Sequence, residues 1–151
     1  MYKNILLPVD GSEHSERAIQ ECIALVKSTG AKAKVTAIHV ISHFHLHYQP
    51  WATPKSVHKK IEKEHEEEAR QFAQEMVAKL AKRVKSEGVD CEGLVVVGDH
   101  AYEEIISSAE KRKCDLIVMA SHGHKGLNAV LLGSETTKVL THSKIPVLVV
   151  R

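Results

Sequence analysis

The residues with the clearest chemical potential form a glycine-rich segment from Ser121 to Gly126, with Gly133 and Ser134 a few positions further on. The apolar run 116–120 directly precedes this segment. Where a buried strand ends in a glycine-rich loop and a Gly-Ser pair opens the next helix, unpaired backbone N–H groups can bind an anion. The glycine spacing is neither that of a P-loop nor that of a dinucleotide-binding fold. The segment therefore predicts a phosphate site with a spacing of its own.

The elements that must position this segment alternate between strand and helix. Short apolar runs are typical of strands buried on both faces, and they occupy 5–9, 35–40, 94–97, 116–119 and 147–150. Helical patterns fill the intervals, at about 13–29, 56–87, 101–113 and 134–142. We therefore expect an α/β fold with residues 1–151 in a single domain: a doubly wound five-stranded parallel sheet in the order 3-2-1-4-5, with helices on both faces.

Ligands of such sheets bind at the carboxyl ends of the strands, where the strand order reverses. In the order 3-2-1-4-5 this point lies between the first and fourth strands, so Asp10 faces the glycine-rich segment. An acid that can hydrogen-bond a ribose or a base, opposite a loop of free amides, indicates a nucleotide.

Blocks spread over the whole chain resemble the universal stress protein family. They are Pro8-Val9-Asp10-Gly11-Ser12, His39-Val40, Met119-Ala120-Ser121-His122-Gly123 through Gly133-Ser134, and Ile145-Pro146-Val147-Leu148-Val149-Val150. Nucleotide-binding members carry Gly-x2-Gly-x9-Gly-Ser/Thr, and here nine residues separate Gly123 from Gly133, with Ser134 next. The first position of the motif is Ala120 instead of glycine. This is the smallest departure available, and it costs little unless the residue needs a positive φ.

The resemblance implies a site for ATP, with Mg²⁺ as a further cofactor. It implies that Gly123, Gly133 and Ser134 hold phosphates, that Asp10 holds the ribose or adenine side, and that Val40 receives adenine through its backbone. The full set of candidate binding residues is Pro8, Val9, Asp10, Val40, Met119, Ala120, Ser121, Gly123, Gly126, Gly133, Ser134 and Glu135. We identify no catalytic residue.

Several of these residues have an alternative, structural interpretation. Asp10 with Glu13 resembles a capping box, so Asp10 can cap the first helix, and this role can coexist with binding. Ser134 can be an N-cap, and Gly123 and Gly126 can be turn glycines. Gly30 and Gly88 stand where helices should end.

The long helical pattern predicts one apolar stripe. Its members recur every three or four residues and are Ile61, His65, Ala69, Phe72, Met76, Leu80 and Val84. The segment 42–54 before it contains His43, His45 and His47, which alternate and could bind a transition metal. A surface loop is the favoured interpretation, because nothing nearby supplies a further ligand such as cysteine, and we assign no metal.

Composition narrows the class of protein. The 21 basic and 19 acidic residues are interspersed and give a net charge of +2, which argues against nucleic-acid binding and against a membrane-surface anchor. The three cysteines have no Cys-x-x-Cys spacing, so neither a disulfide framework nor a zinc ribbon is expected. With no signal segment and no membrane-spanning run, we expect a cytoplasmic protein.

Three functions compete at this point. The leading one is an ATP-binding regulatory module of the stress response, whose nucleotide is coupled to dimer contacts or to an unknown regulatory protein partner. The alternatives are a nucleotide-free dimeric interaction module and a slow ATPase, although no Walker-type lysine or kinase-type loop supports dedicated catalysis. The strand 146–150 is an apolar sheet edge, which predicts a homodimer through that strand, and the resemblance implies the same dimer.

Overall fold

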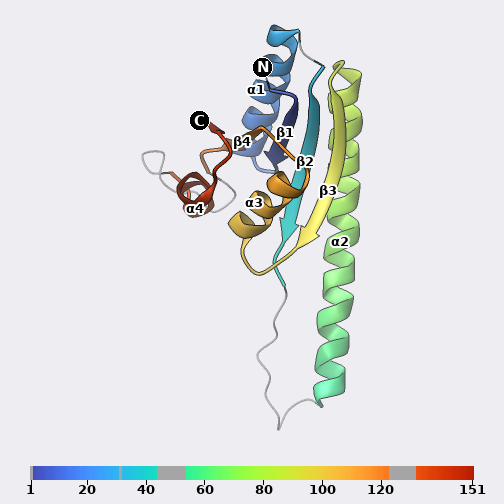
Figure 1. Cartoon of the computed structure of the whole chain (residues 1–151). Helices are drawn as coiled ribbons and strands as arrows, with labels where there is room; N and C mark the ends of the chain where they lie inside the picture. The colour runs from blue at the N-terminus through green and yellow to red at the C-terminus, as the bar shows by residue number, and fades with distance from the viewer. Residues whose placement is uncertain (1, 31, 44–53, 123–131) are drawn as a thin grey trace.

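The computed structural model describes residues 2–30, 32–43, 54–122 and 132–151, in which strands and helices alternate (Figure 1). The strands are β1 (Asn4–Pro8), β2 (Lys34–Ile41), β3 (Asp90–Val97), β4 (Leu116–Ala120) and β5 (Val147–Val150). The helices are α1 (Glu13–Thr29), α2 (Lys55–Ser86), α3 (Ala101–Lys111) and α4 (Ser134–His142). All four strand pairings are parallel and the order is β3-β2-β1-β4-β5, which confirms the predicted fold.

The sheet is covered on both faces because successive side chains of a strand point to opposite sides. In β1, Ile5 and Leu7 belong to the core that includes buried residues of α1 and α2. Leu6, between them, belongs to the core that includes residues of α3 and α4. Both sets are almost fully buried, and this is why the strand is continuously apolar instead of alternating.

Helix α1 follows β1 after a short turn, and its N-cap residue differs from the predicted one. The N-cap is Ser12, whose side chain accepts a hydrogen bond from the Ser15 N–H at 3.1 Å. Asp10 lies two residues before the cap, so the predicted capping box from Asp10 to Glu13 is wrong. At the other end Gly30 has a φ of +61°, the left-handed conformation that a helix C-terminus favours and glycine adopts without strain.

The predicted apolar stripe of α2 is confirmed only in the second half of the helix. Its member Val84 is buried, and Met76 and Leu80 are partly buried against the core. Ala73, Val77 and Ala81, which the prediction did not include, are buried as well, and none of the helix residues before Ala73 is buried. Phe72, a member of the predicted stripe, is 73% exposed. The period was correct, but periodicity does not say how far along the helix the core extends or which neighbouring residues widen the buried face.

Strand β5 lies at an edge of the sheet and hydrogen-bonds with β4. Leu148 is 40% exposed there, while its neighbours in the strand are partly buried. Among the residues that the structure describes, no helix combines the length and the apolar character needed to cross a membrane.

Candidate functional site

The chain leaves β1 through a tight polar turn. The Asp10 carboxylate accepts a hydrogen bond from the Ser12 N–H at 3.0 Å, and the Asp10 N–H donates to Ser15 Oγ at 3.3 Å. Gly11, between them, has a φ of +79°, a conformation that an L side chain would strain. These bonds orient Asp10 at the carboxyl edge of the sheet, where the sequence predicted it. Val9, by contrast, has a buried side chain in the core beneath α1 and α2.

The end of β2 is bonded to the end of β1 by a histidine. His39 Nδ1 lies 2.7 Å from the carbonyl oxygen of Val9. A carbonyl can only accept, so Nδ1 carries the proton and donates it. The next residue, Val40, is partly buried on the α3 and α4 side. Pro8 ends β1 opposite Ile38, so Pro8 and Val9 lie beside the end of the strand that carries Val40.

The end of β4 and the start of α4 are joined by two hydrogen bonds. The Gly133 N–H donates to the Ser121 carbonyl at 2.8 Å, and Thr136 Oγ1 donates to the Ala120 carbonyl at 3.0 Å. The Ser121 N–H in turn donates to the Val150 carbonyl of β5 at 2.7 Å. The structure thus holds the start of α4 against Ala120 and Ser121 at the end of β4.

The first turn of α4 has backbone amides that find no acceptor within the helix. The Gly133 N–H is occupied by Ser121. The first bond within the helix runs from the Thr137 N–H to the Gly133 carbonyl, so the N–H groups of 134–136 have no acceptor within the helix. Gly133 is the N-cap and Ser134 the first helical residue, so Ser134 is not the cap. An anion at this end would bind the amides of 134–136.

Close packing favours glycine at position 133. A Cβ added there would lie 3.1 Å from the Ser121 carbonyl oxygen and 3.4 Å from His122 Cα. Ala120, at the first glycine position of the motif, lies within β4 and pairs with Val150. Its backbone is therefore extended and has no need of glycine. Met119 beside it has a buried side chain that belongs to the core on the α3 and α4 face.

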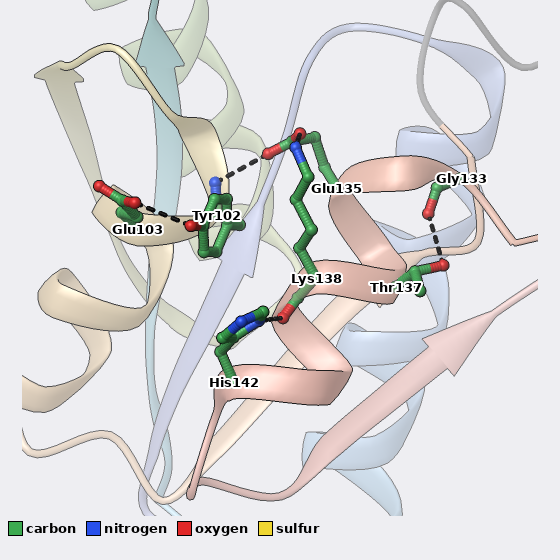
Figure 2. Close-up of polar contacts among 7 residues, drawn as sticks. All are labelled: Tyr102, Glu103, Gly133, Glu135, Thr137, Lys138 and His142. Atoms are coloured by element: carbon green, nitrogen blue, oxygen red, sulfur yellow. Dashed lines mark hydrogen bonds and ion pairs between the residues drawn. The ribbon is translucent and has the colours of Figure 1, made fainter.

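Glu135 bridges two helices (Figure 2). Its Oε2 accepts a hydrogen bond from the Tyr102 N–H in the first turn of α3 at 2.9 Å, and its Oε1 pairs with Lys138 Nζ at 3.0 Å. The N-cap of α3, His100, makes no side-chain capping bond of its own. Glu135 therefore completes the N-terminus of α3, a role that the sequence analysis missed because the bond spans 33 residues.

Two histidines that the sequence analysis did not select lie beside the site. The rings of His14, in the first turn of α1, and His122, after β4, have centroids 5.6 Å apart. His122 Nδ1 is 3.1 Å from Ser121 Oγ. His14 Nδ1 is buried and has no hydrogen-bond partner in the part of the chain that the structure describes. The first turn of α1 therefore approaches the end of β4, next to the first turn of α4.

A cavity of about 430 Å³ lies between α1 and α2, beside the turn after β1. Apolar Ile19 and Leu80 contribute to its lining, and Glu16 and Arg83 pair at 2.8 Å at its rim. Burial opposes ionisation of Glu16, but hydrogen bonds from Arg83 and Gln20 outweigh it, and the pKa of Glu16 is lowered. The cavity is on the α1 and α2 face, and β4 and α4 contribute no residue to its lining.

Some candidates lie outside the described residues: Gly123, Gly126, His45 and His47. His43 is exposed, with Nδ1 3.3 Å from Glu66 Oε2. Within the described ranges, no group of three or more His, Cys, Asp or Glu residues is arranged to hold a metal ion.

The cysteines are not placed for thiolate chemistry. Burial raises the pKa of Cys22 to about 12 and that of Cys91 to about 11. Burial also raises the pKa of Cys114. A thiol with a pKa this high stays protonated near neutral pH and is a poor nucleophile or metal ligand.

The order of the strands, the acid after β1 and the amides that begin α4 define an α/β protein with a candidate anion site at a topological switch point. The family model described as "Universal stress protein family" matches residues 1–151, and the chain belongs to that family.

Related proteins agree with this assignment. Universal stress protein MJ0577 of Methanocaldococcus jannaschii is 34% identical over 159 residues, which cover 100% of this chain and 96% of the relative. Universal stress protein MJ0531 of the same organism is 32% identical and covers 100% of this chain and 83% of the relative. The solved structure of MJ0577 superposes with a TM-score of 0.83 at 35% identity, over 99% of this chain and 96% of that one. A universal stress protein solved in complex with cAMP shares the fold, with a TM-score of 0.68 at 23% identity over 99% and 97% of the two chains.

Proposed function

We propose that this protein binds ATP in the crevice between the ends of β1 and β4, and that nucleotide occupancy regulates its contacts with a second copy or with a regulatory protein partner. The observation that carries the proposal is the junction between Ser121 and Gly133. It holds the unpaired amides of the first turn of α4 at the end of β4, on the edge of the sheet where Asp10 is oriented. The complex of a universal stress protein with cAMP is a precedent for an adenine nucleotide on this fold.

The chemistry of the donors suits this ligand. Phosphate oxygens accept hydrogen bonds from amides, and the partial positive charge of a helix N-terminus favours an anion. The approach of His14 to His122 brings the first turn of α1 to the same place. Since the described residues offer no protein cluster for a cation, Mg²⁺ would enter bound to the phosphates.

Two hydrogen bonds link the start of α4, where nucleotide would bind, to the edge strand where a dimer would form. The Gly133 N–H donates to Ser121, and the Ser121 N–H donates to Val150 of the edge strand β5. Two copies pairing through β5 would cover an apolar edge that soluble proteins rarely leave open. A phosphate at the first turn of α4 would then act on the dimer through two hydrogen bonds.

The first experiment asks whether nucleotide is present at all. Protein purified from its host is denatured, and the released small molecules are identified by mass spectrometry. Adenine nucleotide at near-stoichiometric amounts is the expected result. Its absence, together with no heat of ATP binding in calorimetry, would refute the proposal.

The second experiment tests the site with Ser134→Asp. An acid in the first turn is favourable for a helix, so the fold should persist. Two unit charges about 8 Å apart at an effective dielectric constant of about 20 repel by about 2 kcal/mol, so ATP should bind at least tenfold more weakly. The matched control is Ser56→Asp, which places the same change in the exposed first turn of α2 and should leave ATP affinity unchanged. Equal affinity of both variants would contradict the site.

The proposed function also includes a location, which is the cytoplasm. The three cysteines are buried and form no disulfide, which suits a reducing compartment. Cell fractionation with antibody detection tests it, and recovery of the protein outside the cytoplasm would contradict it.

A further inference from the structure

Helix α2 extends well past the end of the sheet (Figure 1). Its buried side chains begin at Ala73, and none of the residues 55–72 is buried. We call residues 55–72 the α2 overhang. At 1.5 Å per residue it is about 27 Å long. This segment lacks the packed apolar face from which most helices in proteins gain their stability.

The α2 overhang presents large apolar side chains to solvent. Val57 is 44% exposed, Ile61 is 42% exposed and Phe72 is 73% exposed. Spacings of four and eleven residues put all three on one side of the helix, since eleven residues are close to three full turns. We call these three residues the apolar stripe. Further along α2, Met76 and Leu80 line the cavity between α1 and α2.

Charge is divided between the two halves of the α2 overhang. Residues 55–63 hold four lysines and one glutamate, a net charge of +3 with histidine neutral. Residues 64–72 hold four glutamates and one arginine, a net charge of −3. Each half is therefore complementary to the other.

This division is unfavourable for a helix that stays alone. Helix N-termini favour acidic residues, yet the first turn of α2 has none and begins at Lys55, after a Pro54 that makes no side-chain cap. The ion pairs from Lys60 to Glu64 and from Lys63 to Glu67 have the lysine on the N-terminal side, which is the weaker orientation. Both pairs are also long, at 3.7 and 3.8 Å, and highly exposed. The arrangement stabilises this helix less than the reverse order would.

We propose that the α2 overhang is a self-association surface that pairs antiparallel with the α2 overhang of a second copy of this chain. Antiparallel pairing about a two-fold axis between residues 63 and 64 sets the half of charge +3 against the half of charge −3, twice. It also brings Val57 within one helical turn of Phe72 of the second copy, so the apolar stripes cover each other. Parallel pairing would set like charges together. This interface is separate from the β5 edge and does not depend on nucleotide.

The first test removes the stripe. Sedimentation velocity is measured for the wild type and for Phe72→Lys, which puts a lysine opposite the lysines of the second copy. The dissociation constant of the α2 interface should rise at least tenfold. Gln74→Lys, an exposed change on the other side of α2, is the matched control and should assemble like the wild type. Each variant is also made together with Leu148→Lys, so that loss of assembly at α2 is distinguished from loss at β5.

The second test uses charge. One variant makes the whole overhang acidic, with Lys59→Glu, Lys60→Glu and Lys63→Glu. The other makes it basic, with Glu66→Lys, Glu67→Lys and Glu68→Lys. Each alone should lose association through α2, and an equimolar mixture should recover it. Raising the salt from about 0.1 M to about 1 M shortens the Debye length from about 10 Å to about 3 Å and should weaken the recovered complex.

The third test fixes the orientation. Chains carrying Val57→Cys are mixed with chains carrying Phe72→Cys and oxidised, while the native cysteines remain buried. A disulfide between positions 57 and 72 is expected. Predominant disulfides between equal positions would overturn the antiparallel arrangement.

The proposal fails if Phe72→Lys sediments like the wild type, or if the two charge variants do not associate when mixed while circular dichroism shows that both helices are intact. A change in melting temperature at Phe72→Lys, without any change in sedimentation, would mean that the stripe is covered by the same chain. That outcome would also overturn it.

Discussion

Replacing Glu135 with alanine separates a structural role of this carboxylate from a role in binding nucleotide. In the structure the side chain accepts a hydrogen bond from the Tyr102 N–H at 2.9 Å and pairs with Lys138 at 3.0 Å. Loss of a capping bond costs about 1 kcal/mol, and loss of an exposed i,i+3 pair costs about 0.3 kcal/mol. Glu135 is 41% exposed, so solvent screens both interactions and the total should stay near 1 kcal/mol.

The expected shift in melting temperature follows from the size of the chain. For about 150 residues, 1 kcal/mol corresponds to about 2–4 °C. Glu135→Gln keeps an oxygen that can accept from the Tyr102 N–H, so its loss should be about half. Differential scanning calorimetry measures stability, and titration calorimetry measures ATP binding on the same samples.

Glu103→Ala is the matched control, because Glu103 accepts from the Tyr102 hydroxyl at 2.8 Å and not from the helix N-terminus (Figure 2). It should melt close to the wild type. Glu135→Ala should bind ATP as the wild type does at temperatures well below its melting point. A variant of unchanged stability that has lost ATP binding would refute the structural role and return Glu135 to the binding site.

Four further outcomes are expected. Ser12→Ala removes the N-cap of α1 and should lower the free energy of unfolding by about 1 kcal/mol, which urea denaturation measures. Leu148→Lys should abolish association through β5, whereas Leu140→Lys, at a similarly exposed residue of α4, should leave it intact, and sedimentation measures both. The hydrogen bond from Lys34 lowers the pKa of Glu92, so Glu92 stabilises the fold above its unfolded pKa, and this stability is lost as pH falls through its folded pKa. The free energy of unfolding of Glu92→Gln should therefore fall less on acidification than that of the wild type, and an identical acid transition would contradict this. ATP turnover should stay far below about 10 s⁻¹, and a rate near that value that survives purification and disappears in Ser134→Asp would overturn the regulatory assignment.

Local rules explain why the elements could be predicted from the sequence. The five apolar runs correspond to β1 to β5, because strands buried on both faces require apolar residues. Gly30 ends α1, because the left-handed conformation of a helix cap favours glycine. The order β3-β2-β1-β4-β5 agrees with the one assumed for a doubly wound sheet, but right-handed crossovers are compatible with other orders, so the residues alone did not derive it. The acid after β1 could be located, since the carboxyl ends of parallel strands share an edge.

The errors have one physical cause, which is that a side chain has several partners within reach. Asp10 and Ser12 are both good caps, and the geometry of the turn through Gly11 decided for Ser12. In α2 the predicted stripe meets the core only from Met76 onwards, and packing on the sheet also buries Ala73 and Val77 while Phe72 stays exposed.

What the sequence by itself determined is the set of elements, their alternation and the edge of the sheet at which a ligand would bind, because these depend on periodicity, chirality and short-range sterics. Only the tertiary structure decided which groups at that edge are free. The Gly133 N–H donates to Ser121 and the Glu135 carboxylate accepts from Tyr102, whereas the amides of 134–136 have no acceptor in their helix. Hydrogen bonds between residues far apart in the chain depend on positions fixed only when the helices pack on the sheet, and no local pattern records them.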